Sequence, residues 1–189
     1  MRFLVLFLSL LLPAVVQARL GESVTEFGVR YGAPKDTLST RTADKMSPLV
    51  GGAIHRTYEY QGWKIRAAFL QLDGPCVRMD YQKILTAGVK PQIQNYELQA
   101  IASANTPAGM TWKQAMYNSP DLPGSGLTKF AQSYFAGALG QKMWQRSDGA
   151  ILWSRSHLMV RLELPAAREH EAQIKAAKEQ KARDSVPQF

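Results

Sequence analysis

The chain has 189 residues, of which 46% are hydrophobic, and its formal net charge at pH 7 is +8. This length fits one modest domain, or one domain with a tail, and it supplies enough apolar residues for an ordinary core. The single cysteine excludes an internal disulfide and the zinc motifs that are built from several cysteines. The basic balance favours attraction to anionic surfaces without defining a specific site.

Residues 1–18 have the three parts of a secretory signal peptide. Arg2 is the positive start, an apolar run of 14 residues follows at 3–16, and Val16-Gln17-Ala18 forms a small-residue cleavage site. The run is shorter than the roughly 20 residues of a membrane-spanning helix, so an uncleaved anchor is the less favoured alternative. No cysteine follows the run to carry a lipid. We therefore expect a mature chain that begins at Arg19, has no transmembrane span after cleavage, and is periplasmic or secreted.

Removing Arg2 with the leader leaves 22 of the 23 basic residues against 15 acidic ones, a net charge of about +7. Such a charge favours anionic partners. Because an exported protein meets little nucleic acid, the expected partner is an envelope protein or an anionic envelope polymer, and no nucleic-acid partner is expected.

The mature chain is expected to open with a helix. Ser23 and Glu26 have the spacing of a capping box, in which each side chain caps the backbone of the other residue. Gly32 and Pro34 then end the helix. Its apolar face is formed by residues at helical spacing: Val24, Phe27 and Tyr31.

The same stretch, from Gly21 to Pro34, reads Gly-x-Ser-x-x-x-Phe-x-x-x-Tyr-Gly-x-Pro. This pattern resembles the helix-start motif of the SmpA/OmlA (BamE-like) group of small outer-membrane assembly lipoproteins. In that group the motif precedes a three-stranded antiparallel sheet, so the resemblance implies a helix followed by a meander. The lipid-bearing cysteine of the group is absent here, so neither a lipid anchor nor a partner is implied. The wider layout, from RLGES through GWKI to ELQAIASAN and a later Trp, also resembles uncharacterised small exported bacterial proteins, and this likeness implies no activity.

The strongest pattern in the sequence is a pair of consecutive hairpins at 54–83. Gln61-Gly62 separates two strands rich in aromatic residues, and Asp73-Gly74-Pro75 marks a second turn before a third strand begins at about Cys76. A two-residue loop sets a register with three cross-strand pairs: Tyr60 with Trp63, Glu59 with Lys64, and Tyr58 with Ile65. The sequence therefore predicts a three-stranded antiparallel meander.

The middle strand of this meander alternates between apolar and charged side chains. Its apolar residues share one face: Trp63, Ile65, Ala67 and Phe69. Lys64 and Arg66 lie on the opposite face. This alternation is typical of a sheet with one buried and one solvent-exposed face, so helices from the flanking segments are expected to cover the apolar face.

The segments that flank the meander carry weaker patterns. A polar loop is expected at 35–53, and a helix is expected to begin near Pro91 and to end at Asn105. Trp112 and Met116 have the i, i+4 spacing of a short apolar lid. A loop at 118–126 then precedes a second helix, which has one apolar face and ends at Gly140. That face is formed by Leu127, Phe130, Ala131, Tyr134, Phe135 and Ala138.

A second hairpin is predicted around Asp148-Gly149, the favoured pair for a two-residue type I′ loop. Counting back from this loop places Trp144 directly opposite Trp153 in a non-hydrogen-bonded pair. The later alternation puts four apolar residues on one face: Leu158, Val160, Leu162 and Leu164. If no bulge intervenes, three basic residues share the other face: Arg155, His157 and Arg161. These strands belong either to the same sheet or to a second small one.

Residues 166–189 form a charged tail, which we expect to be helical or disordered. Ile174 is its only large apolar residue up to Arg183, so packing against the core is not expected. Three i, i+4 pairs support a solvated helix: Glu171 with Lys175, Lys175 with Glu179, and Glu179 with Arg183. The expected organisation is a leader at 1–18, an α+β domain at 19–165 and this tail.

The sequence contains no recognisable catalytic or metal-binding motif. The three histidines and the one cysteine have no ligand spacing, and neither a phosphate-binding loop nor a nucleophile elbow is found, so no catalytic residue, cofactor or metal is predicted. The sharpest catalytic pair, Cys76 with His55, is expected to span two strand spacings, about 9–10 Å, which is too far for proton transfer. The candidate anion or partner contacts are Arg155, His157, Arg161, Trp144 and Trp153. Three basic residues on a wet strand are, however, more often a solvated face than a site.

Together these patterns predict an α+β fold, with an antiparallel three-stranded meander packed by short helices, a C-terminal β-hairpin and a charged helical tail. The function class that fits is a non-catalytic exported envelope-associated binding or scaffold protein, which makes contact through its aromatic hairpin and basic strand face. One alternative is a small exported hydrolase whose site is not visible in the sequence. Another is a structural protein whose hairpin edge pairs with itself or with a partner strand.

Overall fold

The computed structural model describes residues 20–38, 49–88, 92–115, 143–156 and 158–185, and it confirms the predicted α+β class. Three described helices are α1 (Val24–Tyr31), α2 (Asn95–Ala104) and α4 (Pro165–Asp184). Eight described strands are β1 (Asp36–Leu38), β2 (Ile54–Tyr60), β3 (Trp63–Phe69), β4 (Cys76–Lys83), β5 (Trp112–Ala115), β6 (Met143–Arg146), β7 (Ile151–Ser156) and β8 (Met159–Glu163). Several predicted features lie outside the described residues: the leader at 1–18, Met116, the loop at 118–126, the helix at 127–138 and His157.

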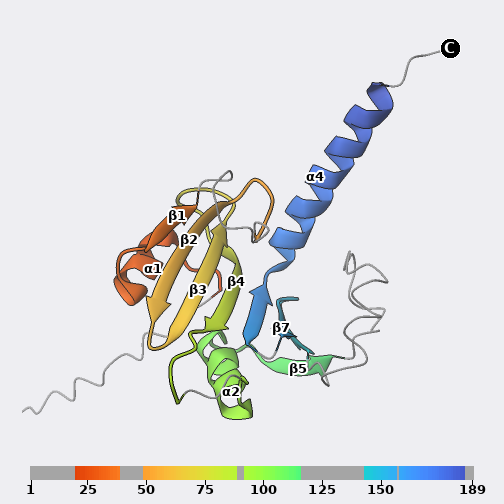
Figure 1. Cartoon of the computed structure of the whole chain (residues 1–189). Coiled ribbons are helices and arrows are strands. Elements are labelled where there is room, and N and C mark those ends of the chain that lie inside the picture. The colour runs from red at the N-terminus through yellow and green to blue at the C-terminus, as the bar shows by residue number, and fades with distance from the viewer. Residues whose placement is uncertain (1–19, 39–48, 89–91, 116–142, 157, 186–189) are drawn as a thin grey trace, which may run out of the picture.

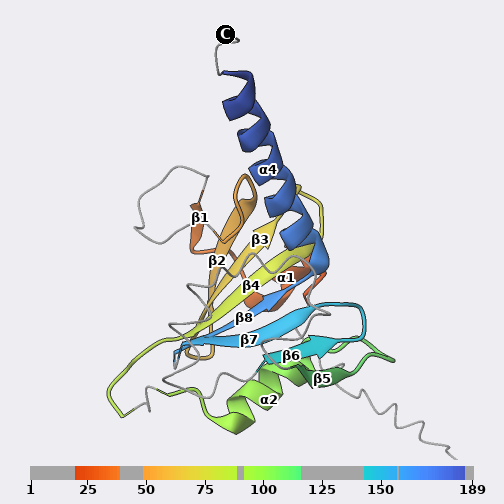
Figure 2. The ribbon, with the colours of Figure 1, turned by 90° about the vertical axis from the view of Figure 1, so that its right-hand side faces the viewer.

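The described strands form one antiparallel sheet, in the order β1-β2-β3-β4-β8-β7-β6-β5 (Figure 2). The meander, β2 to β4, and the edge strand β1 occupy one half of this order. Its last strand, β4, pairs with β8 from Arg78 opposite Glu163 to Gln82 opposite Met159. The C-terminal strands therefore extend the meander, and of the two arrangements left open by the sequence the single sheet is the one observed.

The meander has the predicted register. Tyr58, Glu59 and Tyr60 of β2 lie opposite their expected partners in β3: Ile65, Lys64 and Trp63. The cause is local, because Gln61 and Gly62 both adopt positive φ angles, of 47° and 82°. A two-residue type I′ loop requires this conformation at both central positions.

The C-terminal hairpin is shifted by one residue from the predicted register. Trp144 pairs with Leu152, and Met143 pairs with Trp153, so the expected Trp144–Trp153 pair was wrong. Directly opposed residues share a face of the sheet, and neighbours along a strand alternate between faces. The one-residue shift therefore places the two indoles on opposite faces.

The shift has its origin in the loop between β6 and β7. Arg146 N–H donates to Ala150 O at 2.8 Å, and Gly149 N–H donates to Arg146 O at 2.8 Å, so three residues form the loop rather than two. Gly149 has a φ of 84°, the left-handed conformation that completes a three-residue loop. Asp148 also accepts from Ala150 N–H at 3.2 Å. An Asp-Gly pair fits both loop lengths, and these bonds select the longer one.

A second reversal follows between β7 and β8. Ser156 pairs with Met159, and a bulge separates Ser154 from Ser156. The continuous alternation expected from Arg155 to Arg161 required that no bulge intervene, and it is therefore interrupted by this bulge and turn. Within β8 it holds, since Val160 and Leu162 are fully buried.

The main core lies on one face of the sheet, beneath α1 and α2. The capping box of α1 is present, with Glu26 N–H donating to Ser23 Oγ at 3.3 Å and Ser23 N–H donating to Glu26 Oε2 at 2.7 Å. The buried Phe27 and Tyr31 of this helix join a larger set of buried residues on the sheet and α2, which includes Tyr58, Ile65, Ala67, Phe69, Met79, Leu98, Ile101, Leu152, Val160 and Leu162. The predicted apolar face of the meander is thus confirmed.

The opposite face is not the uniformly wet surface that the sequence predicts. A second, smaller core lies there, formed by Leu49, Val50, Ala53, Ala68, Val77 and Ala167. Leu49–Ala53 covers part of the face, and the first turns of α4 pack beside it. The expectation that the charged tail stays clear of the core was therefore wrong at its start, where Ala167 is fully buried.

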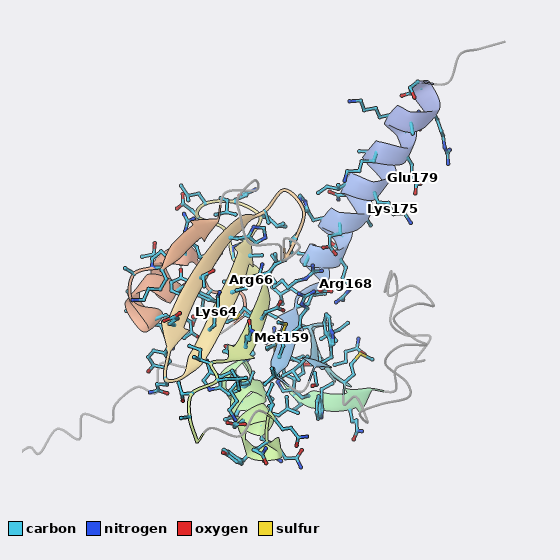
Figure 3. The ribbon with its side chains drawn as sticks, in the orientation of Figure 1. Lys64, Arg66, Met159, Arg168, Lys175 and Glu179 are labelled. Carbon is cyan, nitrogen blue, oxygen red and sulfur yellow. The ribbon has the colours of Figure 1, made fainter. Side chains whose placement is uncertain are left out.

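Beyond these first turns α4 leaves the sheet, as Figures 1 and 3 show for the part that carries Lys175 and Glu179. The docked side of the helix includes Ala167, His170 and Ile174. One and two turns further on, the same side is continued by Lys178 and Lys181, which are exposed. Docking ends where apolar side chains give way to lysines.

Two further predictions need correction. The loop expected at 35–53 contains the three-residue strand β1, which pairs with β2. Trp112 lies in the edge strand β5 and not in a helical lid, because β5 pairs with β6 over four residue pairs. The predicted end of α2 at Asn105 is confirmed, since Asn105 is its C-cap.

Candidate functional site

A pocket of about 270 Å³ opens between α2 and the outer strands of the sheet. Five of its lining residues are apolar: Leu98, Ala102, Trp112, Trp144 and Leu152. The other two described residues that line it are the amides Asn95 and Gln99, so the described part of the chain brings no charged side chain to the pocket. We refer to this feature as the α2 pocket.

The strand side of the pocket is set by the observed register. Trp144 and Leu152 are directly opposed in β6 and β7, so their side chains share the face that looks toward α2. Trp112 lies across from Arg146 in the neighbouring β5–β6 pair, on this same face. Three strands that are separate in sequence therefore contribute one side chain each to the pocket wall.

The indole of Trp112 is held in place by polar contacts to the end of α2. Its Nε1–H lies 3.1 Å from Ala102 O and 2.8 Å from Thr106 Oγ1. The Arg146 guanidinium lies 5.4 Å from the Trp112 ring centroid and pairs with Asp148 at 2.7 Å. One wall of the pocket is thereby preorganised, which lowers the entropy cost of binding a ligand against it.

Among the described elements, the pocket is left open because α2 carries a thin apolar face. Only Leu98 and Ile101 of this helix are buried, and the next lining position, Ala102, presents a single methyl group toward the two indoles. A helix with few large apolar residues cannot fill the space above a wide sheet. An apolar space of this kind, near the small end of the range for ligand sites, suits one apolar group and not a large ligand.

The five residues predicted as anion or partner contacts do not form one cluster. Trp144 lines the α2 pocket, whereas Trp153 lies on the opposite face of the sheet. Arg161 shares that opposite face and lies 5.8 Å from the Trp153 ring centroid. The structure does not describe the side chain of Arg155 or any atom of His157.

Arg161 is engaged within the fold. Its guanidinium makes two bonds to the carboxylate of Asp80, at 2.5 and 2.6 Å, and the Asp80 side chain is fully buried. A two-pronged pair of this kind satisfies the guanidinium and neutralises its charge. Arg161 therefore acts as the structural partner of Asp80, which weakens its candidacy as an anion site.

Cys76 and His55 do not form a catalytic pair. Cys76 lies opposite Phe69 and belongs to the main core, whereas His55 lies opposite Ala68 on the other face. The thiol donates to Arg78 O at 3.4 Å, and burial raises the pKa of Cys76, which keeps it protonated. The backbone of β3 separates the two side chains.

A second cluster, which the sequence analysis missed, ties α4 to the sheet. Arg78 of β4 pairs with Glu163 of β8 at 2.5 Å and with Glu171 of α4 at 2.7 Å. Arg168 of α4 also pairs with Glu163, at 3.3 Å. The only sequence signal for this cluster is a charged residue inside an apolar strand, because its members lie on three elements up to 93 residues apart.

Comparison with known proteins adds no assignment, since no protein-family model, no curated protein and no solved structure matches this chain. Within the described ranges, His, Cys, Asp and Glu side chains do not gather into a group of three that could hold a metal ion. None of the helices seen in those ranges combines the length and apolar character needed to cross a bilayer.

Proposed function

We propose that this protein is a non-catalytic, exported, envelope-associated binding protein, and that the α2 pocket is where it holds its partner. The observation that carries the proposal is an apolar hollow with one tryptophan fixed by hydrogen bonds and a second beside it. Tryptophan is enriched at binding hot spots, where it lines desolvated pockets. The signal-peptide pattern of residues 1–18 and the resemblance to outer-membrane assembly lipoproteins support the location.

The chemistry of the lining defines what the pocket accepts. The lining residues that the structure describes are apolar or amide residues, and they favour an uncharged apolar group over a bare phosphate or carboxylate, because a buried charge needs a partner. Asn95 and Gln99 supply amide groups for a polar atom at the rim. An apolar side chain of an envelope protein fits this description, whereas an anionic polymer does not.

The basic surface has a separate role in this proposal. A net charge of about +7 on the mature chain attracts anionic envelope polymers weakly and without a defined site. Such attraction weakens as salt is added, whereas binding through an apolar pocket does not. Salt dependence therefore distinguishes the two classes of partner.

The test is to fill the pocket. We choose Ala102→Leu, which adds apolar volume from the helix side, and the matched control Ala100→Leu, which makes the same change at an exposed position of the same helix. The mature wild-type chain and the two variants are each immobilised and exposed to solubilised envelope fractions. We expect Ala102→Leu to reduce recovery of the partner protein about tenfold, the equivalent of about 1.4 kcal/mol, and Ala100→Leu to leave it unchanged.

Two results contradict the proposal. If the wild type and both variants recover the same amount of partner protein, the α2 pocket is not where the partner binds. Recovery of no partner at low salt, where a basic protein is most adhesive, removes the binding function altogether.

A further inference from the structure

Both described histidines bind the backbone of the same short segment. Val50 N–H donates to His55 Nε2 at 3.3 Å. His170 Nε2 lies 3.0 Å from Gly51 O. The two imidazoles come from β2 and α4, so this segment is held between the sheet and the helix.

The segment Leu49–Ala53 is what α4 docks against. Leu49 and Val50 are buried beside Ala167 in the smaller core, and Leu49 O also accepts from the Arg78 guanidinium. The Ile174 side chain lies over Gly51 and Gly52, where a methyl group added to either glycine would meet its Cδ1 at 3.7 or 3.6 Å. Releasing this segment would therefore remove apolar contacts from the docked turns of α4.

The two histidines respond oppositely to a proton. A backbone amide can only donate, so Nε2 of His55 must offer a lone pair to Val50. A proton on that nitrogen would place donor against donor and break the bond. His170 faces a carbonyl oxygen, to which a protonated imidazole still donates, so its contact survives acidification.

We propose that Leu49–Ala53 is a proton-sensitive clamp, in which protonation of His55 breaks its bond to Val50, frees the segment and loosens α4 from the sheet. The charged groups around His55 favour this response. Arg66 of β3 and Arg78 of β4 are cations that face it, and both oppose a positive charge on His55 while the segment is bound. On the α4 side are His170 and Glu171, and the carboxylates of Glu171 and Glu163 are already paired with Arg78.

The direction of the pH effect follows from the state of His55 in the fold. Burial, followed by the charges of Arg66 and Arg78, lowers the pKa of His55 below its ordinary value of about 6.5. The unfolded or released segment therefore binds a proton first as the pH falls. The clamp therefore has its full stability above the pKa of His55 in the released segment, about 6.5. It loses stability as the pH falls from that value to the lower pKa of His55 in the closed clamp.

The experiment is amide hydrogen exchange of the whole mature chain, followed by NMR between pH 7 and pH 5 and expressed as protection factors. We expect the protection factor of the Val50 amide to fall about tenfold for each pH unit between the two pKa values of His55, with the amides of the docked turns of α4 falling alongside it. His55→Gln keeps an acceptor at any pH and should abolish the fall. The control His170→Gln should retain it.

The wild-type chain supplies a second readout that does not depend on a variant folding. The ring-proton shifts of His55 and the amide shifts of Val50 should change with the same pH midpoint. Distinct midpoints overturn the proposal, as does a protection factor that stays constant in the wild type or still falls in His55→Gln. None of these results depends on partner binding at the α2 pocket, so the two proposals stand or fall separately.

Discussion

The two halves of the main core use the same face of one sheet but fill it differently. Under α1, Phe27 has three aromatic neighbours, with ring centroids 5.4 Å from Tyr31, 5.4 Å from Phe69 and 5.7 Å from Tyr58. Under α2, the helix contributes Leu98, Ile101 and Ala102, and a hollow remains beside the two indoles of Trp112 and Trp144. In the described part of the chain, the size of the side chains on the covering helix therefore decides whether the sheet face beneath it is filled or left hollow.

The largest expected effect comes from breaking the filled half. Phe27 is fully buried, so Phe27→Ala should lower the free energy of unfolding by roughly 3–5 kcal/mol, measured by urea denaturation. Val29→Ala in the same helix is the matched control, because Val29 is 81% exposed and should cost less than about 0.5 kcal/mol. Similar losses in the two variants would show that α1 is not packed as described.

A pair of identical substitutions sharpens the contrast between core and pocket. Leu162→Ala removes a fully buried side chain and should cost about 4 kcal/mol. Leu98→Ala should cost about 2 kcal/mol, because part of the Leu98 surface already faces the pocket and makes fewer contacts to lose. Equal losses in thermal or urea unfolding would mean that the α2 pocket is closed in solution.

A smaller effect is expected at the residue that connects the two halves. Asn105, fully buried at the end of α2, accepts from Leu20 N–H at 2.8 Å and donates to Tyr81 Oη at 3.2 Å. Asn105→Ala leaves these groups unpaired and should cost about 1–3 kcal/mol in unfolding free energy. Ser103→Ala, at an exposed site of the same helix, should be near neutral, and an equally mild Asn105→Ala would show that water replaces the amide.

The features that could be predicted from the sequence are those that depend on residues close together in the chain. The register of the meander follows from Gln61-Gly62, and the start of α1 follows from Ser23 and Glu26, in each case within four residues. The C-terminal register was wrong because Asp148-Gly149 is compatible with two loop lengths. The choice between them depends on bonds formed by Arg146 and Ala150 in the folded hairpin.

The parts that could not be predicted depend on contacts between distant segments. The docking of α4 rests on Arg78, whose partner Glu171 lies 93 residues away, and on Leu49–Ala53, which reads as a polar loop. The α2 pocket likewise needs α2, β5, β6 and β7 to be placed before any hollow exists. Trp144 was recognised as a candidate contact, but its assigned partner, Trp153, lies on the other face.

The smallest effect concerns the helix that covers the filled half. Ser23 Oγ accepts from Glu26 N–H, so Ser23→Ala removes the cap of α1 and should cost about 1 kcal/mol in the unfolding free energy. Ser23→Thr retains a capping hydroxyl and should recover most of the loss, whereas Thr25→Ala, an exposed change in the same first turn, should have little effect. Because α1 is anchored by Phe27 and Tyr31, we expect the helix to stay docked without its cap. A loss in Ser23→Ala as large as that in Phe27→Ala would mean that the cap, and not the aromatic packing, holds α1 on the sheet.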